Sequence, residues 1–184
     1  FSSSTTTATL TPNVKKAGST FDSSLTVTTL ASSHTLTGPS YSATSSTVGS
    51  GALTIDFGTW SADPTSGGGQ THTANSQDSI TINTTASTTL TELRDLINNA
   101  ATDADNDGDQ DILAAVIYDG TNYMLMLKSE SGASNEMKVT ATNNLANTVS
   151  GVSYNYNATT SNMTQRVSGC LLYTSDAADE HSCG

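Results

Sequence analysis

Residues 79–132 place a strand, a helix and a hairpin in close succession, and this order constrains the fold more than any other part of the chain. Ile80 and Ile82 alternate with polar residues, which predicts a strand over 79–83. Thr89 is followed three residues later by Glu92, the spacing of a capping box that starts a helix. We therefore expect a helix to begin directly after Thr89.

The expected helix has one apolar stripe, since apolar residues recur at intervals of three and four. The stripe consists of Leu90, Leu93, Leu96, Ile97 and Ala100. Arg94 and Asp95 fall on the opposite, solvent-facing side. The helix should pack on a sheet through its stripe.

A hairpin is predicted after the helix, over residues 112–118 and 123–128, with Asp119-Gly120-Thr121-Asn122 as the turn. From these elements we predict core positions at Ile80, Ile82, Leu90, Leu93, Ile97, Val116, Met124 and Leu127. Tyr118, Tyr123, Tyr154 and Tyr156 are interpreted either as a contact surface or as packing across neighbouring strands.

The remainder of the chain is rich in Ser and Thr, and its alternating segments predict strands over 18–30, 49–60, 136–142 and 152–156. Gly38-Pro39 predicts a turn-rich connection over 34–39, and the glycines of 63–69 predict a loop. The fold class expected is mainly β with one helix (α+β), built from antiparallel Ser/Thr-rich domains.

The charge balance argues against two classes of partner. The net charge is −11 and only six Lys and Arg residues are present, whereas nucleic-acid binding needs a basic patch. No apolar run approaches the roughly 18–20 residues that span a bilayer. We therefore expect neither a nucleic acid nor a membrane as partner.

The final residues, 170–184, differ abruptly from the rest. CLLYTSDAADE resembles the translation of a DNA-sequencing adapter, and such scars are excluded from fold reasoning. Without this tail the net charge becomes −8, because Asp176, Asp179 and Glu180 are lost, and no cysteine remains. The alternative is a native extension with a disulfide between Cys170 and Cys183.

One constellation has the chemistry of a metal site. Carboxylates at every second position, with Gly108 at the sixth, match the first half of a Ca²⁺ loop; they belong to Asp103, Asp105, Asp107, Asp109 and Asp111. The twelfth position of an EF-hand needs a bidentate Glu but holds Ala114. The pattern predicts a Ca²⁺ site without an EF-hand, and the alternative is a solvated acidic loop.

Catalysis is not expected. The chain has no G-x-S-x-G sequence, and His34 and His72 stand in loop-like contexts without a patterned acidic partner, so both are predicted at the surface. We expect a protein that is not an enzyme, with no catalytic residue and no organic cofactor.

Four segments, in order, resemble the flagellar filament-capping proteins (the hook-associated protein 2 family). TLTELRDLINNA with AAVIYDGTNYMLMLKSESG is similar to the hook IN motif of hook-associated proteins. LTVTTLASSHTL, TVGSGALTIDFGTW and NMTQRVSG resemble segments of the capping proteins before, at the start of and after their outer domain. The resemblance covers roughly residues 18–169.

The resemblance implies an assembly protein of the bacterial flagellum. Such proteins are exported by the flagellar type III route to the extracellular filament tip. They form a ring, often a pentamer, contact flagellin and other hook-associated proteins, promote flagellin assembly and in some members adhere to host surfaces. Terminal assembly helices are not recognised here and the chain begins with Phe1, so we expect an internal fragment.

The resemblance also implies a division of the chain. Residues 1–46 would be part of an inner head domain, residues 47–169 an outer β-rich domain that contains the motif at 79–132, and residues 170–184 the non-native tail. The alternatives are a secreted adhesin or surface-layer β domain, stabilised by Ca²⁺, and another hook-associated protein with the same motif.

Overall fold

The computed structural model describes residues 32–61, 70–75, 79–101, 110–146, 151–155 and 162–167. Its elements are β1 (Ser33–Tyr41), β2 (Gly51–Trp60), β3 (His72–Ala74), β4 (Ile80–Thr84), α1 (Leu90–Ala100), β5 (Ile112–Tyr118), β6 (Tyr123–Ser131), η1 (Ala133–Asn135), β7 (Glu136–Ala141), η2 (Asn143–Ala146) and β8 (Thr164–Val167). The fold class is confirmed, because the described residues form antiparallel sheets with one α-helix.

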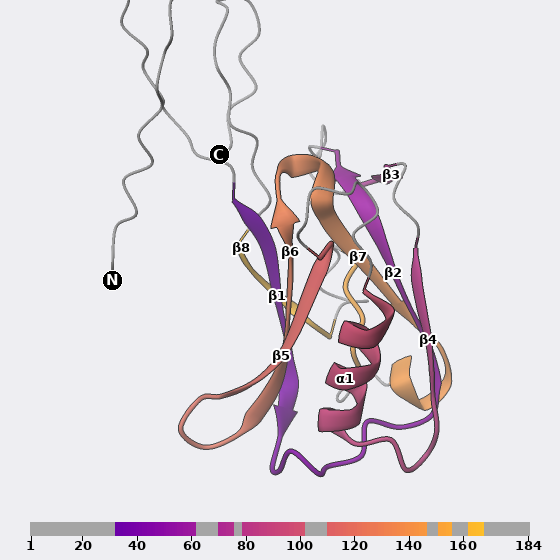
Figure 1. The fold of residues 1–184 in the computed structure, drawn as a ribbon, viewed down its shortest axis with the longest axis vertical. Helices are drawn as coiled ribbons and strands as arrows, with labels where there is room; N and C mark the ends of the chain where they lie inside the picture. The colour runs from indigo at the N-terminus through magenta and orange to yellow at the C-terminus, as the bar shows by residue number, and fades with distance from the viewer. Residues whose placement is uncertain are drawn as a thin grey trace, which may run out of the picture.

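Two sheets form the body (Figure 1). The first has the strand order β5-β6-β1-β8, with every neighbouring pair antiparallel. In the second sheet β2 pairs with β7 along one edge and with β4 and β3 along the other. The strand β2 is thus central, and its buried Leu53, Ile55 and Phe57 alternate with less buried residues, as its sequence predicts.

The helix α1 closes one side of the body. It contacts β5 of the first sheet and β4 of the second, and Figure 1 shows it between these two strands. Its stripe residues Leu90, Leu93 and Ile97 are completely buried. They join one continuous core with residues from both sheets, including Leu36, Phe57, Leu125, Leu127 and Met137. The helix therefore packs between β5 and β4 and covers the core on that side.

A close backbone approach fixes the residue type at one position of β2. A Cβ atom on Gly58 would lie 2.1 Å from the carbonyl oxygen of Thr73 in β3. Because the obstructing atom belongs to the backbone, it cannot move aside as the end of a side chain could. Only glycine fits where β3 pairs with β2.

The prediction of a turn-rich connection over 34–39 is wrong, because these residues lie within β1. Both edges of β1 are paired, with β6 and with β8. Pro39 falls in the register shift between Thr37 and Ser40, where the ladder to β6 is interrupted. A proline is tolerated there because a bulge does not require its missing N–H.

Other predictions fare differently. The strands at 49–60, 79–83 and 136–142, the helix and the hairpin are confirmed with small shifts of their ends. Of the strand predicted over 152–156, residues 152–155 are described, and they form a single bridge between Tyr154 and Val139. The strand over 18–30, the loop over 63–69 and the tail over 170–184 lie outside the described residues.

The predicted domain boundary at 46/47 stays a prediction. The strand β1 lies before it and hydrogen-bonds to β6 and β8, which lie after it. Residues 1–31 of the predicted first domain lie outside the described part of the chain. In the described part, no helix is long and apolar enough to cross a membrane.

Candidate assembly surface

The start of α1 is fixed by the capping box. The N–H of Thr89 donates to Oε2 of Glu92 at 2.8 Å, and the N–H of Glu92 donates to Oγ1 of Thr89 at 3.3 Å. Each side chain thereby satisfies a backbone donor that the first helical turn leaves without an intrahelical partner. The N–H of Leu90 donates to the carbonyl of Ser46, which ties the helix start to the β1–β2 connection.

On the β5 side, the helix is fastened by Asn98. Its Oδ1 accepts from the N–H of Ala114 at 2.8 Å, and its Nδ2 donates to the carbonyl of Ala114 at 2.9 Å. The strand β5 is at the edge of its sheet, and edge strands expose such groups to other chains. Asn98 therefore satisfies the two backbone groups that the edge of β5 would otherwise expose at Ala114.

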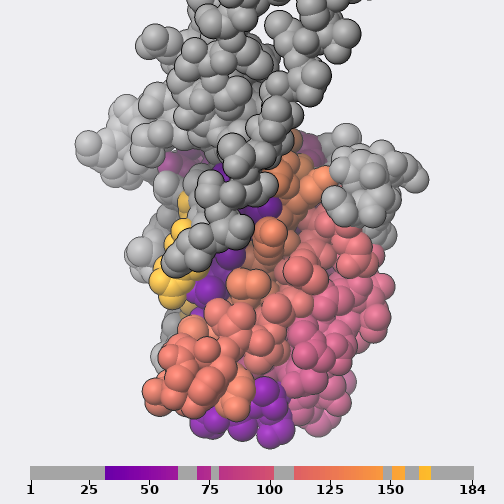
Figure 2. Space-filling model, turned by 60° about the vertical axis from the view of Figure 1, so that its left-hand side comes forward, coloured from indigo at the N-terminus to yellow at the C-terminus, as the bar shows by residue number. Residues whose placement is uncertain are grey.

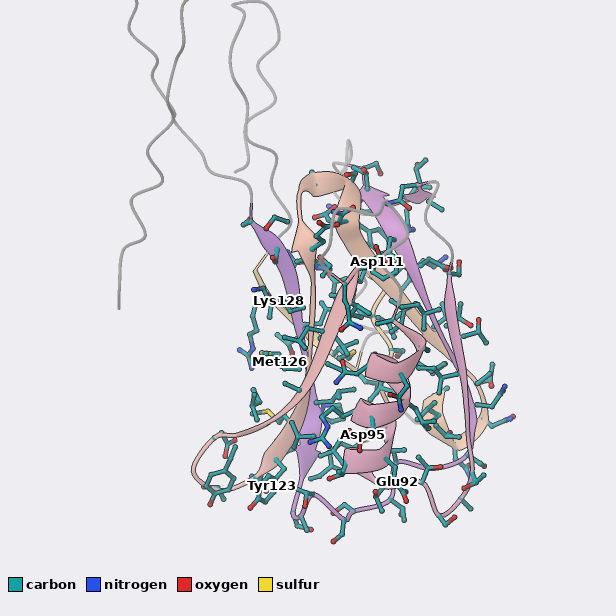
Figure 3. All side chains as sticks on the ribbon, viewed as in Figure 1. Glu92, Asp95, Asp111, Tyr123, Met126 and Lys128 are labelled. Carbon is teal, nitrogen blue, oxygen red and sulfur yellow. The ribbon has the colours of Figure 1, made fainter. Side chains whose placement is uncertain are left out.

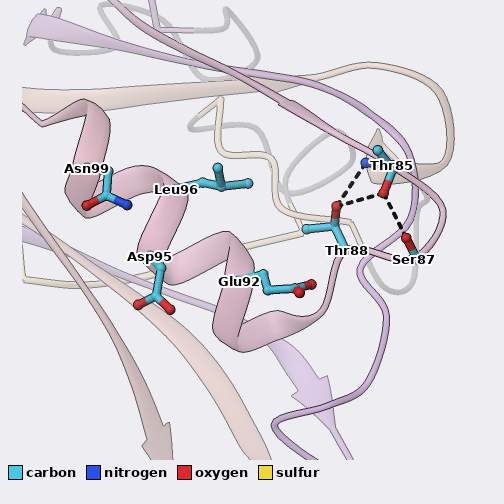
Figure 4. Close-up of a pocket in the computed structure, with 7 residues that line it drawn as sticks. All are labelled: Thr85, Ser87, Thr88, Glu92, Asp95, Leu96 and Asn99. Atoms are coloured by element: carbon cyan, nitrogen blue, oxygen red, sulfur yellow. Dashed lines mark hydrogen bonds between the residues drawn. The ribbon is translucent and has the colours of Figure 1, made fainter.

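On the β4 side, a shallow groove of about 360 Å³ separates α1 from the segment after β4 (Figure 4). We call it the acidic groove; its lining residues are Thr85, Ser87, Thr88, Glu92, Asp95, Leu96 and Asn99. The hydroxyls of Thr85, Ser87 and Thr88 hydrogen-bond one another along one wall. The helix contributes two carboxylates to the groove, and the one on Asp95 is paired with Arg94 at 2.6 Å.

The prediction that Leu96 belongs to the buried stripe of the helix is wrong. Its side chain is 36% exposed and lines the acidic groove, whereas Leu93 and Ile97 are fully buried. Successive helix residues are about 100° apart, which places Leu96 at the edge of the stripe, beyond Leu93 and farthest from Leu90. Leu96 is an apolar contact point in a polar groove.

The hairpin β5–β6 has a second apolar side, which we call the outer face. In register, Leu113 lies opposite Lys128, Ala115 opposite Met126 and Ile117 opposite Met124. The side chains between them in sequence, such as Leu125 and Leu127, point into the core, so these six share the other side of the sheet. Figure 2 presents this side of the molecule, and Figure 3 shows Met126 and Lys128 pointing away from the body.

No described helix covers the outer face, and its apolar residues remain accessible. Leu113 is 50% exposed, while Ala115, Ile117, Met124 and Met126 are half-buried. Met124 was predicted as core, and it lies instead on this accessible side. The predicted core residue Val116 is also only half-buried. A contiguous accessible apolar patch of this kind is typical of an interaction surface.

The tip of the hairpin carries an aromatic pair. The rings of Tyr118 and Tyr123 lie 4.8 Å apart, and Tyr118 is 58% exposed. The turn between them is held by Oδ1 of Asp119, which accepts from the N–H groups of Asn122 and Thr121. These backbone donors lower the pKa of Asp119 below its usual value, because they stabilise its charged form. The predicted turn is confirmed, and the two tyrosines pack across neighbouring strands.

The cationic side chains of the described residues differ in their partners. Arg94 pairs with Asp95 at 2.6 Å on the surface of α1, and Nε of Arg166 donates to Oγ1 of Thr37. Lys128 on the outer face is exposed and forms no ion pair with a described residue. It lines a shallow hollow together with Leu113 and Glu130.

His34 is a correction to the surface position predicted for it. Its side chain is fully buried, and its Nδ1 accepts from the N–H of Met137 at 2.8 Å, which links β1 to β7 across the core. Burial lowers the pKa of His34 to about 4; the nearby Gln165 side chain opposes this and His72 adds to it. His72 is also not a free surface residue, since its ring packs on Trp60 and its Nε2 lies 3.1 Å from the carbonyl of Glu136. Both histidines therefore contact other strands and do not stand free at the surface.

The predicted Ca²⁺ ligands are mostly outside the described part of the chain. Asp103, Asp105, Asp107 and Asp109 belong to 102–109, and only Asp111 is described, almost fully buried just before β5. Among the described residues no group of three His, Cys, Asp or Glu side chains is placed to hold a metal ion. The Ca²⁺ site stays a prediction from the sequence.

Sequence reasoning missed the outer face and Asn98 for different reasons. The signal for the outer face was present, because residues 112–118 are apolar at every position and a half-buried strand should alternate. The role of Asn98 had no signal, since an amide on a helix surface is ordinary and its partner lies sixteen residues away.

No protein-family model matches the chain, and no curated protein sequence matches it. Solved structures do. The chain is similar to the D2-D3 domains of the flagellar cap protein FliD from Escherichia coli, with 25% identity and a TM-score of 0.60 over 79% of this chain and 65% of that one. The D1-D2-D3 domains of the same protein give 26% identity and a TM-score of 0.59, with 79% and 36% covered.

The D2-D3 domains of FliD from Serratia marcescens give 27% identity and a TM-score of 0.54, over 78% of this chain and 67% of that one. The chain therefore spans about two thirds of the D2-D3 structures and about a third of the D1-D2-D3 structure. The shared fold and the recurring identity, over most of this chain and in proteins from different bacteria, relate it to the flagellar cap proteins.

Proposed function

We propose that this chain is a structural part of a flagellar filament cap, at the tip of the filament. It associates with copies of itself in a pentamer-like ring, contacts flagellin and other hook-associated proteins, and promotes flagellin assembly. The observation that carries the proposal is the similarity to the FliD D2-D3 domains over most of the chain. Extracellular location, export by the flagellar route and adhesion to host surfaces belong to the same proposal.

The surface chemistry supports assembly rather than catalysis. The accessible features among the described residues are an apolar outer face, an aromatic hairpin tip and a shallow groove lined by hydroxyls and carboxylates. Buried His34 and half-buried His72 each contact a backbone group of another strand. Surfaces of this type bind other proteins through apolar contact and adaptable hydrogen bonds.

Two measurements test the proposal. Sedimentation velocity of the 184-residue chain over a concentration series should show reversible association. Electron microscopy of the gold-labelled chain, mixed with flagellar filaments stripped of their caps, should show label at filament ends, with intact capped filaments as the control. Label distributed along filaments, or on cell surfaces without regard to flagella, contradicts the proposal and favours an adhesin.

A further inference from the structure

The four methionines of the chain all lie in its described part, and they form two pairs with different surroundings. Met137 and Met163, the inner pair, have exposed fractions of 0% and 3%. Met124 and Met126, the outer pair, are half-buried on β6. Their spacing of two residues places both side chains on the same side of the strand, the side that belongs to the outer face. Access to solvent therefore separates the two pairs.

The outer pair lies in the middle of the outer face. Met126 stands in register between Ala115 of β5 and Thr37 of β1. Met124 stands in register with Ile117 of β5. Figure 3 shows the side chain of Met126 pointing away from the body. The two thioethers therefore form part of the apolar surface of this face, beside the apolar side chains of β5.

A thioether reacts with peroxides by a defined two-electron step. A lone pair on the sulfur attacks one oxygen of hydrogen peroxide, the O–O bond breaks, and the second oxygen leaves as water after a proton transfer. The sulfur loses two electrons and becomes a sulfoxide, while the peroxide is reduced. The flexible apolar side chain is thereby converted into a polar one. The reaction requires that the oxidant reach the sulfur, so its rate at each methionine depends on exposure.

We propose that Met124 and Met126 are oxidation sites of the folded protein, and that a peroxide converts the outer face from an apolar into a polar surface while the inner pair stays reduced. The fold tolerates this change, because a sulfoxide on the outer face keeps its contact with water. A sulfoxide at Met137 would instead place a polar oxygen in the core without water, which costs free energy.

The inference goes beyond the proposed function and does not depend on it. It rests on the burial of the four methionines and on the position of the outer pair in the β5–β6 register. It assigns a class of reactant, a two-electron oxidant of the peroxide type, to a surface of the molecule.

Trypsin allows the two pairs to be read separately. Cleavage after Lys and Arg places the outer pair on peptide 95–128, Met137 on peptide 129–138 and Met163 on peptide 139–166. Mass spectrometry of the three peptides then gives the extent of oxidation at each site.

The full-length chain is treated with hydrogen peroxide for increasing times, and the reaction is stopped with catalase before digestion. Cys170 and Cys183 are first blocked with iodoacetamide, because thiols react with the same oxidant. We expect peptide 95–128 to gain oxygen about tenfold faster per methionine than the other two peptides, because an inner methionine reacts only when the fold opens. Equal rates, or faster oxidation of the inner pair, overturn the proposal.

The same treatment in concentrated urea is the control for intrinsic reactivity. In the unfolded chain all three peptides should gain oxygen at similar rates per methionine, since burial no longer distinguishes them. A preference for peptide 95–128 that persists in urea would assign the selectivity to local sequence and overturn the role of the fold.

Hydrophobic-interaction chromatography of the folded chain measures the change of surface. The chain oxidised at the outer pair should elute earlier than the untreated chain, because its outer face is less apolar. The double variant Met124→Leu/Met126→Leu keeps apolar side chains that peroxide does not oxidise, so its elution should not shift. Met137→Leu is the matched control and should shift as the unaltered chain does. A double variant that shifts equally overturns the assignment to the outer face.

Thermal unfolding followed by circular dichroism separates a change of surface from a loss of structure. The chain oxidised at the outer pair should keep a cooperative transition close to that of the untreated chain. Loss of this transition while the inner pair is still reduced overturns the claim that the fold tolerates the two sulfoxides.

Discussion

The side-chain amide of Asn98 on α1 hydrogen-bonds both backbone groups of Ala114 on β5, at 2.8 and 2.9 Å. A helix side chain thereby takes the place of a neighbouring strand for one residue of an edge strand. The pair holds α1 to the first sheet and removes one pairing site from the edge of β5.

Replacing Asn98 by Ala should destabilise the fold by about 1–3 kcal/mol, because the N–H and carbonyl of Ala114 lose partners in a partly buried setting. Urea unfolding followed by circular dichroism measures the change. Asn99→Ala is the matched control, since Asn99 is exposed on the same helix. Equal stability of the two variants would show that the Asn98 pair contributes nothing.

The capping box predicts a graded response at Thr89. Thr89→Ala removes the acceptor for the N–H of Glu92 and should cost about 1 kcal/mol of stability. Thr89→Ser keeps a hydroxyl oxygen at the same place and should cost only a fraction of this. The comparison is made by chemical unfolding, and a serine variant as unstable as the alanine variant would argue against the hydrogen bond.

Acid should destabilise the protein through His34. In the folded protein its pKa is about 4, below the ordinary value of 6.5, so the unfolded chain binds more protons between these values. The contribution of the neutral ring is therefore fully present above about pH 6.5 and is lost as the pH falls toward 4. Its size is on the order of 3 kcal/mol, from about 1.4 kcal/mol per pKa unit.

The measurement is the free energy of unfolding against pH, compared with that of His34→Gln. The variant should be less stable at pH 8, because the contact from the N–H of Met137 is disturbed. Its stability should fall less steeply between pH 6.5 and 4. His72→Gln serves as the control, and a slope in His34→Gln that matches the unaltered protein contradicts the assignment.

The sequence prediction of Ca²⁺ binding also has a direct test. Calorimetric titration should detect Ca²⁺ binding to the full chain, and Asp105→Asn and Asp107→Asn should each weaken it, because each removes a charged oxygen ligand. A chelator should reverse any stabilisation by Ca²⁺. Absence of heat at millimolar Ca²⁺ would identify a solvated acidic loop instead.

Local patterns predicted the elements that depend on local physics. The box at Thr89 and Glu92 starts α1 where expected, since a cap is satisfied within one helical turn. The turn after Tyr118 is likewise set by Asp119 and Gly120, which has φ of 103°. Such features need only residues close in sequence.

Positions that depend on distant partners were predicted wrongly. His34 reads as a loop residue beside Gly38-Pro39, but pairing of β1 on both edges and the bond from Met137 bury it. Leu96 belongs to the helical stripe by spacing, and the shape of the gap between α1 and β4 leaves it exposed. Neither outcome can be read from neighbouring residues.

The sequence by itself determined that this chain forms a β-rich protein with one capped helix and a tight hairpin, because periodicity, capping and turn chemistry act over a few residues. It also carried the resemblance to flagellar capping proteins. Only the tertiary structure decided which side of the hairpin is left accessible, because that depends on which elements cover it. The same holds for the groove beside Leu96, which exists only where α1 and the segment after β4 meet.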